Sequence, residues 1–305
     1  MKILLAAIDG SAEATKVMSD VRAPYVLASF FYSGWMHNQL ERPDWFSALK
    51  TARFRMLDSG AFTLQTTAIS MAGTKGNAKA LGVDYDLMLD KYIKWTQSVR
   101  RFNLFDVWVE MDISVVTGYD WVHAQRHKLI AAGLGKGLVN VWHANADWDY
   151  WLYLLREAQK PGRSRYVAIE GNALDRPEMD YAKFLHVAYR AGVRVHGFKM
   201  TKLNCLKKYP FYSVDSSSWI ASVVYGTTTT AHRSGGVSSK GKRLRVAEPG
   251  ATPVWKGSTP LRMYRKQRIA MLESSARAWV QASHDLDQYW KRRGVDWDIV
   301  EGMNR

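Results

Sequence analysis

Four carboxylates stand where short apolar runs of β-strand character end: Asp58, Asp112, Glu170 and Asp215. In a barrel of parallel strands all the carboxyl ends meet on one face, which is where such enzymes build their active sites. An acid at the end of a buried strand is costly unless it is paired, hydrogen-bonded or functional. Four acids in register therefore predict a catalytic cluster capable of acid–base and nucleophilic chemistry.

Two further polar residues, His143 and Lys199, occupy the same position on two other apolar runs. A histidine there is either part of the site or a satisfied core residue, and the sequence favours neither interpretation. Other acids in strand-to-helix loops have a simpler explanation, because Asp and Ser cap helices. We expect Asp84 and Asp147 to be helix caps.

The elements that position these residues alternate along the chain. Apolar runs lie at 25–32, 54–62, 107–112, 137–144, 165–171, 193–200 and 212–217. Amphipathic segments separate them at 86–101, 119–132, 147–159 and 177–191. Continuous apolar strands that alternate with helices indicate a parallel sheet covered on both faces. The pattern predicts an α/β fold, a (β/α)8 TIM-like barrel, in preference to an open doubly wound sheet. The absence of a GxGxxG or Walker-type loop weakens the case for a nucleotide cofactor.

The C-terminal part has a different composition. Residues 227–260 are rich in Thr, Ser, Gly and Pro, which predicts a long mobile loop. A final helix is expected over roughly 260–293, with an apolar face packed on the barrel. We therefore divide the chain into a catalytic barrel at 1–226 and an appended basic loop and C-terminal helix at 227–305.

The chain is strongly basic, with a formal net charge of +15, and the excess is concentrated after the last predicted strand. Residues 233–268 hold ten basic residues and a single acid, Glu248. Such a segment attracts a polyanion through counterion release, whereas a solvated, solubilising surface is the alternative. We expect nucleic-acid contacts from Arg233, Lys240, Lys242, Arg243, Arg245, Lys256 and Arg262.

The chain has one cysteine, Cys205, so it can form no intramolecular disulfide and no multi-cysteine metal site. This fits a reducing compartment. The apolar start at 1–8 is short and lacks a basic leader, so it predicts neither a signal peptide nor a membrane span. We expect a cytoplasmic location and no membrane partner.

Two motifs resemble the tRNA-guanine transglycosylase superfamily. Met56–Phe62, with the sequence MLDSGAF, is similar to that family's DSGGF strand end, and Phe211–Trp219 resembles its nucleophile strand. The segments 109–112, 139–143 and 168–171 fall in the order of its base-recognition strands. The resemblance covers about residues 25–220. The short form with YPFYSVDSSSW looks most similar to the phage-type DpdA group of DNA-guanine transglycosylases, which insert 7-deazaguanines into DNA.

The resemblance implies a role for each matching residue. Asp215 would be the nucleophile that attacks C1′ of the sugar, and Asp58 would protonate the departing guanine and deprotonate the incoming base. Asp112 would accept hydrogen bonds from the donor edge of the purine. His143 replaces a glutamine of the family, and Glu170 is also a departure from its pattern. The remaining residues that the resemblance or the strand-end position assigns to the base are Ser59, Gly60, Phe62, Gly171 and Lys199.

The tRNA enzymes carry a structural zinc held by three cysteines and a histidine after the nucleophile strand. Cys205 precedes Asp215, so this chain cannot build that site. We expect no zinc subdomain, no bound metal and no cofactor besides a 7-deazaguanine co-substrate. The loss favours DNA over tRNA as the main partner.

Several functions remain open from the sequence. The leading hypothesis is a pentosyltransferase that exchanges guanine in duplex or single-stranded DNA for a base similar to preQ0, through a covalent glycosyl-aspartate. The alternatives are a tRNA-guanine transglycosylase, a hydrolytic N-glycosylase that uses the same intermediate, and a nucleic-acid-binding barrel without catalysis. Asp58 and Asp215 argue against the last alternative, because a protein that only binds nucleic acid gains nothing from acids placed near phosphate.

Overall fold

A computed structural model of the chain describes residues 1–61, 63, 84–143, 146–170, 181–220, 223, 228–232, 236–240 and 265–302. Eight parallel strands close into a barrel in chain order, which confirms the predicted TIM-like fold. The strands are β1 (Lys2–Leu5), β2 (Tyr25–Ser29), β3 (Phe54–Asp58), β4 (Val107–Val109), β5 (Leu138–Trp142), β6 (Tyr166–Ile169), β7 (Arg194–Gly197) and β8 (Ser213–Ser216).

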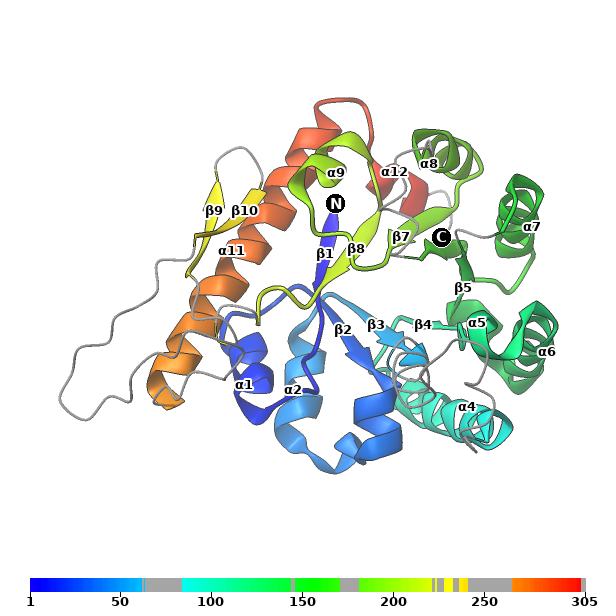
Figure 1. The fold of residues 1–305 in the computed structure, drawn as a ribbon, viewed down its shortest axis with the longest axis horizontal. Coiled ribbons are helices and arrows are strands. Elements are labelled where there is room, and N and C mark those ends of the chain that lie inside the picture. Colours follow the sequence, from blue (N-terminus) through cyan, green and yellow to red (C-terminus); the bar gives the residue numbers. More distant parts are fainter. Residues whose placement is uncertain are drawn as a thin grey trace.

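Helices surround these strands (Figure 1). The α-helices are α1 (Ala12–Asp20), α2 (Pro43–Thr51), α4 (Tyr85–Arg101), α5 (Ser114–Thr117), α6 (Tyr119–Leu129), α7 (Trp148–Gln159), α8 (Tyr181–Arg190), α9 (Leu203–Lys208), α11 (Arg265–Lys291) and α12 (Trp297–Gly302). Shorter helical turns are η1 (Phe31–Met36), η2 (Gln39–Glu41), η4 (Ile130–Leu134) and η5 (Gly135–Gly137). Across the described ranges, none of these helices combines the length and apolarity needed to cross a bilayer.

Side-chain capping fixes where several helices begin. The carboxylate of Asp84 accepts a hydrogen bond from the backbone N–H of Leu87 at the start of α4. Asp147 accepts one from Tyr150 at the start of α7. Both satisfy backbone donors that have no partner within the helix. The prediction that these two acids are caps is confirmed.

The apolar side chains form two cores on either side of the strands. Because side chains alternate along a strand, Met56 and Ala168 lie in the cluster inside the barrel, while their neighbours Leu57 and Ile169 lie in the cluster under the helices. Trp297 of α12 belongs to the inner cluster and contacts the ring of Tyr212. The barrel is thus a filled core whose strand ends serve as a rigid platform.

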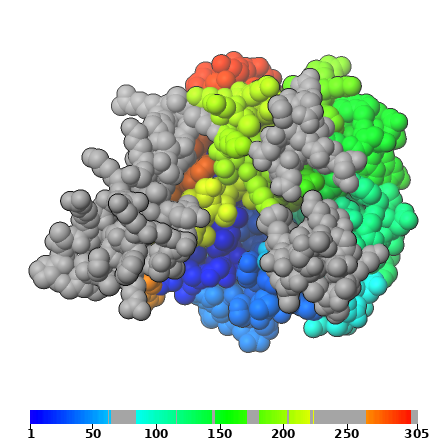
Figure 2. Space-filling view, viewed as in Figure 1, coloured from blue at the N-terminus to red at the C-terminus, as the bar shows by residue number. Residues whose placement is uncertain are grey.

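One strand of the barrel, β1, comes from the start of the chain and was not predicted. Residues 2–5 were not among the predicted runs, but β1 pairs with both β2 and β8 and so closes the barrel. In the space-filling view, blue atoms from the start of the chain lie next to yellow-green atoms from the part of the chain around β8 (Figure 2). The helix α11 holds β1 in place, since the Met1 ammonium lies 2.7 Å from Asp287 and the Ile3 N–H donates to Ser283 Oγ.

The predicted apolar face of the last helix is confirmed, because α11 buries Leu272, Ala276, Trp279 and Leu286. The expectation of an unstructured loop over 227–260 is wrong in part. Residues Thr228–His232 (β9) and Gly236–Lys240 (β10) form an antiparallel hairpin beside α11 (Figure 1). A run of β-branched threonines favours a strand, and this preference outweighs the loop signal from the neighbouring Gly and Ser.

Candidate active site

The predicted site residues that the structure describes lie at or just beyond the carboxyl ends of the strands. Asp58 ends β3, Asp215 lies in β8, and His143 and Glu170 directly follow β5 and β6. Lys199 follows β7 by two residues. Asp58 and Glu170 come two residues after Met56 and Ala168, which face the barrel interior. The period of two along a strand therefore turns these carboxylates toward the barrel axis.

Asp58 is held in an environment that favours its neutral form. Burial raises the pKa of Asp58 to about 7, and the negative charges of Asp215 and Asp112 add to the effect. A hydrogen bond of 3.2 Å from the Gly60 N–H to Asp58 Oδ2 and the charge of Lys199 oppose it. A carboxyl group with a pKa near neutrality is suited to both donating and accepting a proton.

Asp215 is buried and held as a hydrogen-bond acceptor. Its Oδ1 accepts a hydrogen bond of 2.6 Å from the backbone N–H of Lys199 and lies 3.4 Å from His196 Nε2. Lys199 has a φ of +56°, a conformation that costs a non-glycine residue roughly 1 kcal/mol or more. The loop after β7 therefore directs a backbone donor at Asp215 in spite of that cost.

The side chain of Lys199 belongs to the same electrostatic cluster. Burial lowers the pKa of Lys199 to about 8, and the charges of Asp215, Asp58 and Glu170 oppose that lowering. The ammonium group therefore interacts with carboxylates from three strand ends. Lys199 therefore offsets part of the negative charge of the site.

Beneath Asp215, a chain of polar side chains runs into the barrel interior. His196 is fully buried, and its Nδ1 lies 2.6 Å from Ser213 Oγ. Ser213 Oγ in turn hydrogen-bonds the hydroxyl of Tyr166. With Nδ1 engaged by the serine, the other ring nitrogen of His196 faces Asp215. These residues were not predicted from the sequence, because histidine, serine and tyrosine in apolar strands resemble ordinary core residues.

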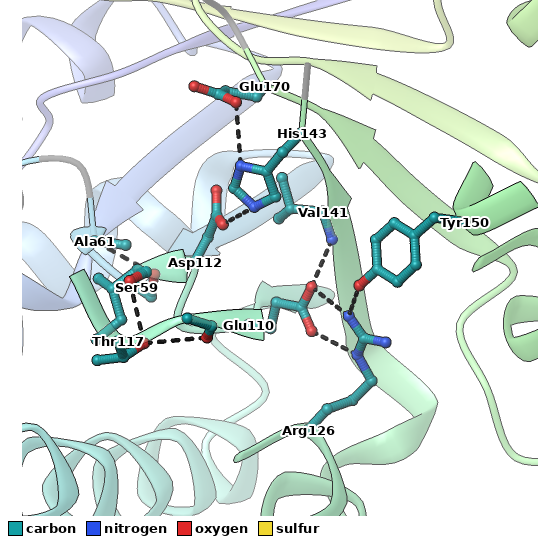
Figure 3. Close-up of polar contacts among 12 residues, drawn as sticks. Ser59, Ala61, Glu110, Asp112, Thr117, Arg126, Val141, His143, Tyr150 and Glu170 are labelled. Carbon is teal, nitrogen blue, oxygen red and sulfur yellow. Dashed lines mark hydrogen bonds and ion pairs between the residues drawn. The ribbon is translucent and has the colours of Figure 1, made fainter. Parts of the chain in front are cut away.

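A second cluster places His143 between two carboxylates (Figure 3). His143 Nε2 forms an ion pair with Asp112 Oδ1, and Nδ1 lies 3.1 Å from Glu170 Oε2. Burial lowers the pKa of His143, but Asp112 and Glu170 outweigh it and raise the pKa to about 10. The imidazole is therefore protonated at neutral pH. His143 is neither an isolated core histidine nor free to donate to a ligand, because both ring nitrogens are engaged.

The turn after β3 depends on a close approach of two backbones. Gly60 has a φ of +78°, and a Cβ atom there would lie 2.4 Å from Phe31 Cβ and 2.9 Å from Ser29 Oγ. Ser59 is fully buried, and its Oγ accepts a 3.4 Å hydrogen bond from the Ala61 N–H. The Gly60 N–H thus holds the carboxyl group of Asp58, and the hydrogen bond between Ser59 and Ala61 stabilises the turn.

This geometry gives a testable prediction for Gly60→Ala. The variant should lose roughly 3 kcal/mol in free energy of unfolding, because the strained φ and the clash with Phe31 add together. The matched control is Gly294→Ala, where φ is +80° but no atom lies within 4 Å of the new Cβ. Urea denaturation should show a loss of only about 1 kcal/mol for the control. Equal losses in free energy of unfolding for the two variants would show that the close approach of Phe31 to Gly60 does not matter.

One buried ion pair was missed by the sequence analysis. Glu110, directly after β4, is fully buried, and Arg126 of α6 binds it through two hydrogen bonds of 2.7 and 2.9 Å (Figure 3). Glu110 Oε1 also accepts from the Val141 N–H, and Arg126 donates to the Tyr150 hydroxyl. Burial, outweighing the opposing charge of Arg126, raises the pKa of Tyr150 to about 12. These contacts tie β4, β5, α6 and α7 together behind Asp112.

A fifth acid, Asp9, follows β1. It is buried, and its Oδ2 accepts a 2.7 Å hydrogen bond from the Ser29 N–H at the end of β2. Burial raises the pKa of Asp9 to about 6. Ser29 pairs in register with Asp58, so Asp9 anchors the strand next to the acid of the site. It escaped the sequence analysis because β1 was not recognised as a strand.

Phe62, Gly171, Arg233, Lys242, Arg243, Arg245, Lys256 and Arg262 lie outside the described residues. Lys240 is the last residue of β10. Within the ranges that the structure describes, no group of three His, Cys, Asp or Glu residues is arranged to hold a metal ion. The absence of zinc from the protein remains a prediction.

Comparison of the chain with protein-family models, curated proteins and solved structures gave no match. A barrel fold hosts many unrelated activities, so the fold alone does not define a function. The function must therefore be inferred from the chemistry of the strand-end residues.

Proposed function

We propose that this chain is a transglycosylase that exchanges guanine in DNA for a 7-deazaguanine base similar to preQ0. The observation that carries the proposal is the unequal pair of carboxylates at the ends of β3 and β8. Burial and the charge of Asp215 raise the pKa of Asp58 to about 7, whereas an oxygen of Asp215 is fixed by a 2.6 Å hydrogen bond from the Lys199 N–H. Two carboxylates in such different environments can act as acid and nucleophile.

The first half of the reaction uses both groups at once. A carboxylate oxygen of Asp215 attacks C1′ of the target nucleoside, and the bond between C1′ and the guanine nitrogen breaks. The electron pair of that bond leaves with the base, and the proton of Asp58 neutralises it. A covalent glycosyl-aspartate remains, which keeps the DNA strand intact.

The second half runs in reverse with the new base. Asp58, now ionised, takes the proton from the nitrogen of the incoming 7-deazaguanine. That nitrogen attacks C1′ and displaces the carboxylate of Asp215. Because the target base is stacked in a duplex, it must first be flipped out or presented in single-stranded DNA.

Asp112 and Glu170 are suited to hold the donor edge of a guanine-type base. The ring nitrogen and exocyclic amino group of such a base present N–H donors, which carboxylate oxygens accept. His143 binds one oxygen of each carboxylate and supplies a positive charge between them. In this proposal His143 is a positioning residue that keeps both carboxyl groups aimed at the base.

The choice of DNA over tRNA rests on one feature of the sequence. The single cysteine precedes Asp215, which is incompatible with the zinc site of the tRNA enzymes that the chain resembles. The net charge of +15 supports a nucleic acid as substrate, and it does so equally for DNA and tRNA.

Mass spectrometry of nucleosides tests the proposal. The purified protein is incubated with DNA or with tRNA and a panel of 7-deazaguanines, and the polymer is then digested to nucleosides. We expect a 7-deazaguanine nucleoside from DNA and free guanine in equal amount. A product from tRNA alone would overturn the choice of DNA, and released guanine with abasic sites would identify a hydrolase.

His143→Gln tests how the base is held. The variant removes the cation between Asp112 and Glu170, so the two carboxylates repel each other and one takes up a proton. We expect the KM for the incoming base to rise roughly tenfold or more, with a smaller change in kcat. In the wild type, base binding should weaken as pH rises through the His143 pKa of about 10.

The control is His127→Gln, an exposed position on the same helix as Arg126. It should leave both kinetic constants and the alkaline pH dependence unchanged. If His143→Gln retains the wild-type KM and pH profile, His143 does not position the acids.

A further inference from the structure

A pocket of about 420 Å³ lies at the opposite face of the barrel from the carboxylate cluster. Its wall consists of η5, which precedes β5, the turn between α7 and β6, and the first residue of β7. All three segments lie at the amino ends of their strands. At about 3.3 Å per residue, the four residues of β6 separate the two faces by roughly 13 Å.

The lining of this pocket is strongly cationic. Lys136, Lys160, Arg163, Arg165 and Arg194 contribute five basic side chains, and the residues that line it include no acid. Lys160 forms an ion pair with Glu157 at the end of α7. The pocket therefore gathers positive charge in a concave site, which focuses the field on an anion.

The arginines are held in place by the surrounding structure. Arg194 donates a 2.7 Å hydrogen bond to the Ser164 carbonyl, and its guanidinium lies 5.1 Å from the ring centroid of Tyr166. The guanidinium of Arg163 packs over Gly135, where an added Cβ would lie 2.7 Å from Nη1. Gly162, with a φ of +76°, makes the turn that presents Arg163. Planar, fixed guanidinium groups match the geometry of phosphate oxygens.

We propose that this pocket is a phosphate-binding site that takes one nucleotide-sized ligand, separate from the site of base exchange. Its volume lies within the range of roughly 300–1,000 Å³ that is typical of small-molecule sites. The same chemistry suits a free mononucleotide and one nucleotide of a DNA strand. The two sources differ in how binding responds to salt, because a strand releases several counterions and a mononucleotide few.

The test measures binding of three probes to the full chain: inorganic phosphate, guanosine monophosphate and a short fluorescent single-stranded oligonucleotide. The variant Arg163→Gln/Arg165→Gln removes two cations of the pocket. The matched control, Lys94→Gln/Arg101→Gln, removes two exposed cations from α4. We expect the pocket variant to weaken binding of a phosphate-bearing probe at least tenfold and the control less than twofold.

The pattern of losses identifies the source of the ligand. A loss confined to the oligonucleotide, with a salt slope reduced by roughly 2, assigns the pocket to a nucleic-acid strand. A loss that extends to the mononucleotide and to phosphate assigns it to a free ligand. Equal losses in the pocket variant and the control would overturn the proposal. If the double variant does not fold, Lys136→Gln at an exposed position of the lining should give a loss of about threefold, and no loss would likewise overturn it.

Discussion

Asp215→Asn should abolish base exchange while the protein still folds and binds DNA. The amide cannot form the bond to C1′, so we expect the exchange rate to fall by roughly 10⁴-fold or more. The amide keeps an oxygen that can accept the 2.6 Å hydrogen bond from the Lys199 N–H, so the local structure should persist. Exchange of labelled guanine into DNA measures the rate, and circular dichroism and DNA-binding assays confirm the fold.

The control for this variant is Asp9→Asn. Asp9 is likewise a buried acid, in the turn after β1, and likewise accepts a backbone hydrogen bond. Its amide should preserve the contact with Ser29 and retain exchange within about threefold, since we assign it an anchoring role only. Exchange by Asp215→Asn at a rate near that of Asp9→Asn would remove Asp215 as the nucleophile.

Asp58→Asn should lower the exchange rate by roughly 10²- to 10⁴-fold, because the departing base loses its general acid. The pH profile gives a second signature. In the wild type the acid must be protonated, so kcat/KM should fall about tenfold per pH unit above the Asp58 pKa of about 7. This alkaline limb should disappear in Asp58→Asn. A limb that persists in the variant belongs to another group.

The same substitution should stabilise the protein at high pH. The folded state raises the pKa of Asp58 from 3.8 to about 7, so it binds the proton more tightly than the unfolded chain does. Ionisation of Asp58 therefore lowers the free energy of unfolding. This loss is absent below pH 3.8, grows as the pH rises, and is complete above pH 7. Asp58→Asn removes this cost and should raise the free energy of unfolding at pH 8 by on the order of 2 kcal/mol, after allowance for solvent screening.

Urea unfolding of wild type and variant at pH 3.5 and at pH 8 measures this effect. Asp9 also has a raised pKa, but it is present in both proteins and cancels in the difference. A gain that is the same at both pH values would show that packing, and not ionisation, is responsible. If Asp58 is the acid of the reaction, its replacement by Asn should lower activity and raise stability together, because the buried charge is removed.

The placement of the main carboxylates was predictable because it depends on local patterns. Parallel strands that are buried on both faces give continuous apolar runs, and a polar residue at the end of such a run lies at the strand end. Asp58, Glu170 and Asp215 follow from that rule. The closure of the barrel by residues 2–5 did not follow, because β1 gains its stability from β8 and α11, which lie more than 200 residues away.

The pairing of polar side chains also depends on contacts that the sequence does not show. The run 107–112 contains two acids, and the strand ends at Val109, so that Glu110 turns into the ion pair with Arg126 and leaves Asp112 for the site. No sequence pattern links His143 to Asp112 and Glu170 from neighbouring strands. The pairing of β9 with β10 was missed for a similar reason, since these strands lie against α11.

The most direct test of the proposed function is to locate the covalent intermediate. The protein is incubated with DNA in the absence of an incoming base, denatured rapidly, digested with nuclease and protease, and examined by peptide mass spectrometry. We predict a deoxyribosyl adduct on the peptide that contains Asp215, absent from Asp215→Asn and lost when a 7-deazaguanine is added before denaturation. Base exchange that proceeds with no adduct, or with an adduct on another residue, would contradict the assignment of Asp215.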